Sequence, residues 1–230
     1  MNERKRAKPK CAPKPPKSGV GAAADSDMAA EILETCLELA EESHWDALRL
    51  RQVASRLGVP LGAVLRHYRD LDAVADAWFR RAWDAMLAPP PDGFAALPAP
   101  ERIYQVIMRW FDALVAHRAV TGQMLRTKLY PSHPHHWVPM VFNLSRTIHW
   151  LREAAFLDAG GRQRQLEEIG LTAIFLATLN DWLRDKTPGQ ERTRAALRRR
   201  LNRADRVMAR ACSLAKARPG LRPSGADRSA

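Results

Sequence analysis

The stretch from residue 50 to residue 68 carries the most specific pattern in the sequence. Ala54 is small at a point where two helices could cross closely, and Gly58, four residues later, can adopt the left-handed conformation of a tight turn. Aliphatic residues would fill a small core between the two helices: Val53, Leu57, Val59 and Val64. The spacing predicts a helix-turn-helix, with an ordinary helical hairpin as the alternative. The second helix of a helix-turn-helix enters the major groove of DNA.

Side chains on and beside this second helix are the candidate contacts to DNA. Arginine guanidinium groups hydrogen-bond to phosphates and to guanine edges, so Arg66 and Arg69 could bind either one. Leu61 and Leu65 give the same helix an unusually apolar surface. We predict that eight residues of the motif contact DNA: Arg49, Arg51, Leu61, Gly62, Arg66, His67, Tyr68 and Arg69.

Four helices are expected to build and position this motif. The first follows the capping residues at 25–27 and ends near Ser43, and shorter helices span 47–57 and 61–67. The fourth is capped by Asp70 and runs from Leu71 to Leu87, after which Pro and Gly break the chain at 88–93. Residues 26–70 are therefore predicted to form one module. Residues 1–25, rich in Lys, Pro, Gly and Ala, are expected to be a disordered basic arm.

The remaining sequence predicts a second, larger helical domain over 71–216, followed by a disordered tail over 217–230. A helix with Pro100 in its first turn is followed by expected helices over 120–129, 138–158 and 163–186, and a last helix begins after residues 187–189. Gly160 and Gly161 fit as the stop of the 138–158 helix. Because no segment alternates apolar and polar residues as a strand does, the predicted class is all-α.

The two last helices are the candidate contact with a second copy of the chain. Apolar residues recur along the final helix in steps of three and four from Leu197 to Ala215, and the helix before it is apolar on nearly every face from Ile169 to Leu179. Large apolar faces favour a four-helix bundle in a homodimer, although a monomeric core is an alternative. The predicted interface residues are Ile174, Phe175, Leu197, Leu201 and Met208.

Aromatic and methionine residues gather in the larger domain. Such side chains suit a cavity for an apolar small molecule, yet at helical spacing they more often form a plain core. The candidate pocket residues are Trp83, Met86, Tyr104, Met108, Phe111, Trp137, Met140 and Trp150.

The charge distribution and the composition indicate which kinds of partner and which cellular location to expect. Of the formal charge of +12, residues 1–18 carry +6 and residues 191–230 carry +9, which leaves −3 for the middle of the chain. The basic ends could bind a polyanion or could serve only to solvate the termini. A secretory signal and a bilayer-spanning stretch are both missing, which predicts a cytoplasmic location.

Metal, cofactor and catalytic roles are not indicated. The three cysteines lack the paired spacing of a metal site or a disulfide framework, so we expect reduced thiols. The histidines at 133, 135 and 136 have metal-ligand chemistry, but nearby prolines place them in a loop where a solvated or capping role is favoured. We found no nucleophile with a base, glycine-rich phosphate loop or paired carboxylates, so no enzyme activity and no cofactor are expected.

The chain resembles the TetR family of bacterial transcriptional regulators over about residues 28–215. The resemblance rests on four short motifs: Val53-Ala54, Gly58-Val59, His67-Tyr68 and Asp72-Ala73-Val74. It implies a homodimeric regulator, a repressor, whose binding to an operator in double-stranded DNA is changed by an apolar effector. Pro60, Leu65 and Leu71 stand where the family has a Ser or Thr, a phosphate-contacting Tyr and a Lys, so three family contacts to DNA are missing.

A second, shorter resemblance concerns residues 173–189 and 193–201. These are similar to the C-terminal region of the ubiquinone-biosynthesis accessory proteins, which share the TetR fold and bind lipid. It implies an alternative function, a lipid-binding accessory protein that does not read DNA.

Overall fold

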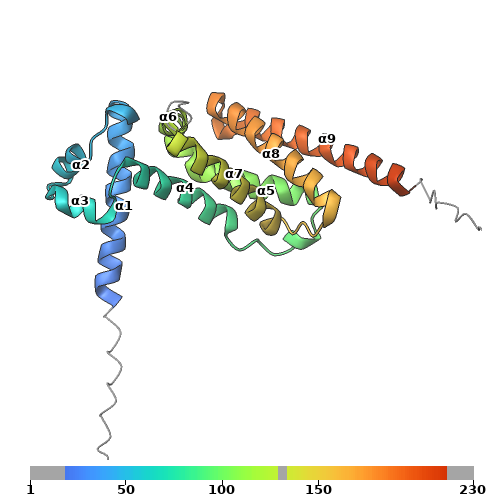
Figure 1. Cartoon of the computed structure of the whole chain (residues 1–230), viewed down its shortest axis with the longest axis horizontal. Coiled ribbons are helices and arrows are strands. Elements are labelled where there is room, and N and C mark those ends of the chain that lie inside the picture. The colour runs from blue at the N-terminus through green and yellow to red at the C-terminus, as the bar shows by residue number, and fades with distance from the viewer. Residues whose placement is uncertain (1–18, 129–133, 217–230) are drawn as a thin grey trace, which may run out of the picture.

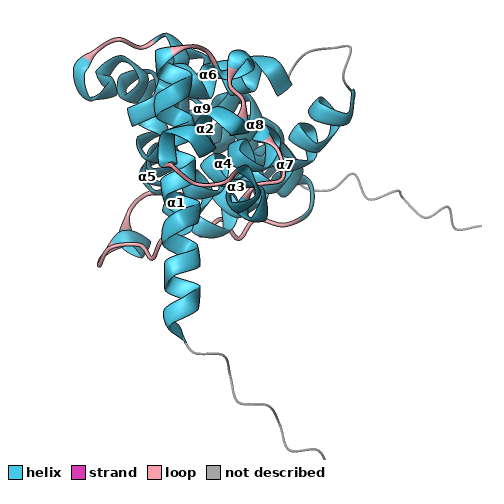
Figure 2. Ribbon diagram, turned by 90° about the vertical axis from the view of Figure 1, so that its left-hand side faces the viewer, coloured by secondary structure: helices cyan, strands magenta, loops and turns pink. Residues whose placement is uncertain are grey.

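The computed structural model describes residues 19–128 and 134–216, and within those ranges the regular structure is helical throughout, with short connections (Figures 1 and 2). The predicted all-α class is confirmed. The main helices are α1 (Gly19–Glu42), α2 (Leu50–Leu57), α3 (Leu61–His67), α4 (Leu71–Leu87), α5 (Ala99–Leu114), α6 (Arg118–Lys128), α7 (Pro134–Ala154), α8 (Gly161–Arg184) and α9 (Glu191–Lys216). Short 3-10 turns lie between some of them: η1 (Trp45–Ala47), η2 (Phe94–Ala96), η3 (Val115–His117) and η4 (Pro188–Gln190).

The helices form two groups joined by α4. Helices α1, α2 and α3 pack together at one end of the molecule, and α4 leads from them into the second group, where it packs mainly on α5 (Figure 1). Helix α9 packs on α5 and α8, and α7 lies between α4 and α8. No described helix combines the length and the apolar content that a membrane crossing requires.

Local signals predicted the bounds of some helices well. Helices α3 and α4 have the predicted ends, and Asp70 Oδ1 accepts a 2.8 Å hydrogen bond from the Ala73 N–H as an N-cap should. Helix α1 differs: it begins at Gly19, six residues before Asp25, because alanines at 22–24 favour continued helix. Helix α2 begins at Leu50, since the preceding residues form the separate turn η1. The basic arm before residue 19 and the tail after residue 216 lie outside the described residues.

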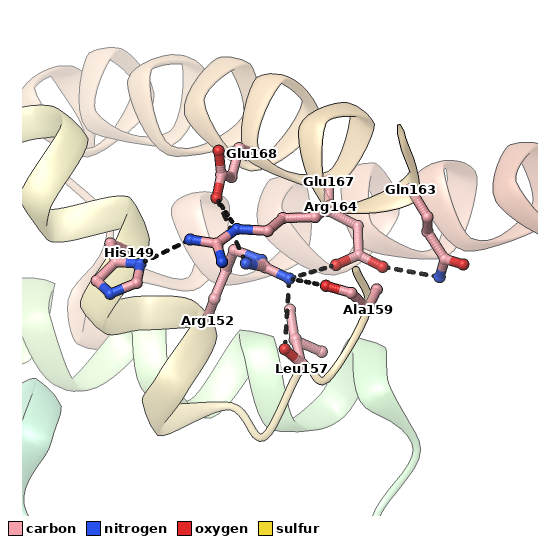
Figure 3. Close-up of polar contacts among 8 residues, drawn as sticks. All are labelled: His149, Arg152, Leu157, Ala159, Gln163, Arg164, Glu167 and Glu168. Carbon is pink, nitrogen blue, oxygen red and sulfur yellow. Dashed lines mark hydrogen bonds and ion pairs between the residues drawn. The ribbon is translucent and has the colours of Figure 1, made fainter. Parts of the chain in front are cut away.

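A buried arginine, and not the predicted glycine pair, organises the end of α7. The helix ends at Ala154, and Phe156 takes the left-handed conformation with φ 54°. Arg152, only 2% exposed, donates to the carbonyl oxygens of Leu157 (3.3 Å) and Ala159 (3.0 Å). Its guanidinium also pairs with two glutamates at the start of α8, Glu167 and Glu168 (Figure 3). Arg152 thus fixes α8 against the end of α7.

A buried carboxylate organises the connection from α8 to α9. Asp185 follows α8 and is 2% exposed. It accepts hydrogen bonds from the backbone N–H and hydroxyl of Thr187 (2.9 and 2.6 Å) and from those of Thr193 (2.8 and 2.7 Å). Burial alone would raise the pKa of Asp185, but these hydrogen bonds hold it well below its ordinary value of 3.8.

Replacing this carboxylate by an amide should destabilise the fold. In Asp185→Asn the charge-assisted hydrogen bonds are lost, so we expect the free energy of unfolding at pH 7 to fall by about 3 kcal/mol. A lowered pKa in the folded state stabilises the protein fully above the ordinary pKa of 3.8, and this contribution is lost as the pH falls below it. The difference between wild type and Asp185→Asn, measured by urea unfolding, should therefore shrink from pH 7 toward pH about 3. A pH-independent difference would show that the ionised carboxylate is not what holds the turn.

Candidate nucleic-acid interface

Helices α2 and α3 form the predicted helix-turn-helix. Gly58 takes the left-handed conformation with φ 67°, and the Val59 N–H donates a 3.0 Å hydrogen bond to the Ala54 carbonyl oxygen to close the turn. Of the four aliphatic residues predicted to lie between the two helices, Val53 and Val64 are buried and Leu57 and Val59 are half-buried; Ala54 at the crossing point is buried. The packing leaves one side of α3 without a neighbour in the described part of the chain.

The exposed side of α3 is short and largely apolar. Leu61 and Leu65 are 42% and 44% exposed, and Gly62 and Arg66 beside them are also exposed. These four residues of α3 form two rows of i, i+4 neighbours, so they share one face. We call them the α3 outer face.

Arginines surround the α3 outer face. Residues 47–69 contain five arginines and no Asp or Glu, which gives this segment a formal charge of +5. Arg56 pairs with Glu42 on α1 (2.7 Å), and Arg69 pairs with Asp70 (3.0 Å). Arg49 donates to the carbonyl oxygens of residues 46 and 48, at 2.9 and 2.7 Å. Among the described residues, neither Arg51 nor Arg66 has a hydrogen-bonding or ion-pairing partner, so both remain available to an anionic ligand.

His67 and Tyr68 lie inside the module. Tyr68 is 9% exposed, and its hydroxyl donates a 3.1 Å hydrogen bond to the carbonyl oxygen of Ala29 on α1. The His67 side chain is 11% exposed, and its Nε2 lies 3.6 Å from Asp25 Oδ1. The side chains of His67 and Tyr68, both predicted to contact DNA, point toward α1 and attach the end of α3 to it.

Polar contacts connect the helix-turn-helix module to the second group of helices. On α1, Glu34 pairs with Arg81 of α4 (2.5 Å), and Glu41 Oε1 lies 2.8 Å from Nδ1 of His117 in η3. The Trp45 N–H in η1 donates a 2.7 Å hydrogen bond to Gln123 of α6. A movement of α4 or α6 would therefore be transmitted to α1.

Comparison with known proteins identifies the family. No protein-family model matches the chain, and no curated protein matches it. Among solved structures, the chain is similar to the TetR transcriptional regulator from Nitrosomonas europaea ATCC 19718, with 42% sequence identity and a TM-score of 0.70. The match covers 78% of this chain and 98% of that chain. The chain belongs to the TetR family of transcriptional regulators.

A second solved structure shows the same fold at much lower identity. The TetR transcriptional regulator from Rhodococcus sp. RHA1 is 16% identical, with a TM-score of 0.52, over 77% of this chain and 94% of that chain. The family resemblance predicted from the sequence motifs is confirmed by the 42% identical regulator from Nitrosomonas europaea.

The aromatic residues of this TetR-family chain mostly pack on one another. The Phe111 ring, fully buried, lies 5.6 Å from Phe175 and 5.4 Å from Trp182 between ring centroids, and Trp110 adds a further contact at 5.1 Å. Met86 and Met108 are also in this core. These rings fill the space that a bound molecule would need, so ligand binding here requires them to separate.

The other described pocket residues belong to the edge of that core: Tyr104 is a buried member, and Trp83 and Trp150 are partly buried against it. Trp83 and Trp150 meet edge to face at 5.6 Å, and the Trp83 Nε1–H donates a 2.9 Å hydrogen bond to Thr147 on α7. Tyr104 faces α9, where the Arg198 guanidinium lies 4.0 Å from its ring centroid. The side chains of Trp137 and Met140 lie outside the described residues, as do those of the histidines at 133, 135 and 136.

Three of the five predicted dimer residues are part of this chain's own core. Phe175, Leu197 and Leu201 are 3%, 0% and 3% exposed, whereas Ile174 and Met208 are half-buried. The seam on α9 that the sequence indicated therefore packs on α5 and α8 of the same chain. On α8, four apolar residues outside this core are exposed, Leu166, Ile169, Leu176 and Leu183 at 55%, 69%, 45% and 38%, and on α9 Val207 is 57% exposed.

The residues behind the lipid-binding resemblance are explained by the fold. Asp185, inside the first of its two segments, accepts hydrogen bonds from Thr193, the first residue of the second segment, in the α8–α9 connection. Trp182 Nε1–H donates a 2.7 Å hydrogen bond to Gln190 in the same connection. In this chain, these residues of the resemblance hold the connection between α8 and α9.

Proposed function

We propose that this TetR-family regulator binds an operator in double-stranded DNA as a homodimer, represses transcription, and is released by an apolar small molecule. The observation that carries the proposal is the α3 outer face: it is exposed, it holds Arg66, which has no ion-pairing partner among the described residues, and it lies in a segment with a formal charge of +5. Arginine hydrogen-bonds both to phosphates and to guanine, and a helix of this kind fits the major groove.

A dimer is supported by the unoccupied side of α8. Its exposed residues follow each other in steps of three and four: Leu166, Ile169, Ala173, Leu176, Asn180 and Leu183. This is the spacing by which two helices pack lengthwise. A second copy placed on α8 through a two-fold axis would cover the stripe on both chains and would present two α3 helices together.

Release by an effector is supported by the contacts between the two groups of helices. An effector that separates the aromatic rings around Phe111 would have to displace α5 or α8, and α4 packs directly on α5. Because Arg81 on α4 pairs with Glu34 on α1, such a displacement would change the orientation of the helix-turn-helix module. Two α3 helices in a dimer could then no longer meet half-sites one helical turn apart.

Selection from random double-stranded DNA at near-physiological salt tests the proposal. We expect the purified full-length protein to enrich a palindrome whose half-sites are separated by about 10 base pairs or a multiple of that. The specific site should be bound at least about a thousand-fold more tightly than bulk DNA. If no sequence is enriched and binding only fades as salt rises, the regulator proposal fails. Mass spectrometry of lipids that co-purify with the protein would then test the accessory-protein alternative.

A further inference from the structure

We propose that α3 recognises its operator mainly through the methyl groups of thymines, which Leu61 and Leu65 contact, together with one guanine that Arg66 hydrogen-bonds. This inference rests on the proposed function and specifies which bases the half-site contains. It arises from the chemistry of the α3 outer face and not from any contact shared with relatives.

The α3 outer face has very few groups that can read a base. Ala63 and Val64 are buried, and His67 is turned toward Asp25 on α1. Of the four residues that remain, only Arg66 carries a hydrogen-bonding side chain. A major groove offers one guanine-specific pattern that arginine can match with two hydrogen bonds. The other side chains of this face that can meet base edges are the two leucines.

Leucine contacts favour one base over the other three. The 5-methyl of thymine is the apolar group that a base pair presents in the major groove, whereas cytosine and adenine present amino groups there. A leucine packed on an amino group would deprive it of water without offering an acceptor, which is unfavourable. Leu61 and Leu65, one helical turn apart and both more than 40% exposed, can each cover a methyl group.

Gly62 is placed to let α3 approach the bases closely. A Cβ atom at this position would have no atom within 4 Å, and the residue does not take a left-handed conformation, so the fold itself does not require glycine here. The missing side chain leaves the space between the Leu61 and Arg66 side chains open for base edges.

The positive charge around Leu61 and Leu65 favours DNA, rather than an uncharged apolar partner, as the ligand of this face. Five arginines and no acidic residue lie between residues 47 and 69, and Arg51 and Arg66 lack an ion-pairing partner among the described residues. The positive charge of these arginines complements the phosphate backbones on the two sides of a major groove. An apolar surface framed in this way by cations therefore fits a groove whose floor carries methyl groups.

Deoxyuridine substitution in the selected operator tests the inference. Deoxyuridine keeps every hydrogen-bonding group of thymidine and removes only the 5-methyl. For each contacted thymine we expect about a four-fold loss of affinity, the factor that burial of one methyl-sized group gives. Leu65→Ala should bind the thymidine operator and the deoxyuridine operator equally well at the positions that Leu65 covers. Removing the leucine and removing the 5-methyl group abolish the same contact, so their effects should not add. Leu87→Ala, an exposed leucine on α4, should keep the full deoxyuridine effect.

The outcomes separate this inference from the proposed function. A strongly enriched operator that binds equally well with deoxyuridine at every thymine would overturn thymine reading and leave the regulator proposal intact. An operator without thymine in its half-sites would do the same. If no operator is enriched at all, the proposed function itself fails. Circular dichroism of Leu65→Ala, whose side chain is 44% exposed in the wild type, should show an unchanged fold.

Discussion

Arg66→Ala should remove most of the preference for the operator while leaving weak, salt-sensitive binding to any DNA. Arg66 is the hydrogen-bonding side chain of the α3 outer face, and no described residue neutralises it. A bidentate contact to guanine contributes about 1–3 kcal/mol, and a dimer makes two such contacts. The expected loss of operator affinity is roughly 30-fold to 20,000-fold. Fluorescence anisotropy with the selected operator and a scrambled duplex, at one fixed salt concentration, measures both affinities.

Two further variants make this result specific to α3. Arg199→Ala removes an exposed arginine on α9, far from α3 in Figure 1, and should leave operator affinity unchanged. Arg69→Ala should weaken binding to the operator and to scrambled DNA by a similar factor. Arg69 pairs with Asp70 and is 83% exposed, a position from which it would contact the phosphate backbone and not a base. If Arg66→Ala kept the wild-type ratio of operator to scrambled affinity, α3 would not be the helix that reads the bases.

Features set by neighbouring residues were predicted well from the sequence. The turn at Gly58, the start of α3 after Pro60 and the cap of α4 at Asp70 each depend on residues within one helical turn. Their conformations follow from local sterics and local hydrogen bonds, so the sequence contains the needed information. The family motifs lie in this same stretch, which is why the fold and the family could both be predicted from it.

Features set by distant residues were not predictable in the same way. Tyr68 looked like a surface residue of the motif, but the carbonyl that accepts its hydrogen bond belongs to Ala29, on a different helix. The buried partners of Arg152 lie beyond the end of α7. Asp185 had a local signal, since Thr187 two residues later can donate back to it, as in the turns that aspartate commonly forms. That pattern could have been found in the sequence.

Helical spacing shows which residues share a face, but not what that face packs on. Leu197 and Leu201 share a face of α9 as predicted, yet α5 and α8 of the same chain cover it. On α8, apolar residues occur on almost all sides, which concealed that one stripe of them is exposed. The same limit applies to the aromatic residues, because their spacing is identical whether Phe111 lines a cavity or packs on Phe175.

Ile169→Glu should convert the protein from a dimer into a monomer. Ile169 is 69% exposed in the single chain, so a glutamate there stays hydrated and the monomer remains folded. In a dimer built on α8 the two-fold axis would bring two such carboxylates into an apolar interface, and an unpaired charge in such a place costs several kcal/mol. We expect the dissociation constant of the dimer to rise by at least about 100-fold. Sedimentation equilibrium separates a species of 25.9 kDa from one of twice that mass.

Matched substitutions distinguish the exposed stripe on α8 from the predicted seam on α9. Leu87→Glu places the same charge at an exposed leucine on α4 and should leave the dimer intact. Leu201→Glu buries a carboxylate at a position only 3% exposed within one chain, so it should unfold the monomer, which a lowered helical circular dichroism signal would report. Folded Ile169→Glu monomers should also lose operator affinity, because each copy then reads one half-site alone. An Ile169→Glu protein that remains dimeric would place the contact between copies elsewhere than on this side of α8.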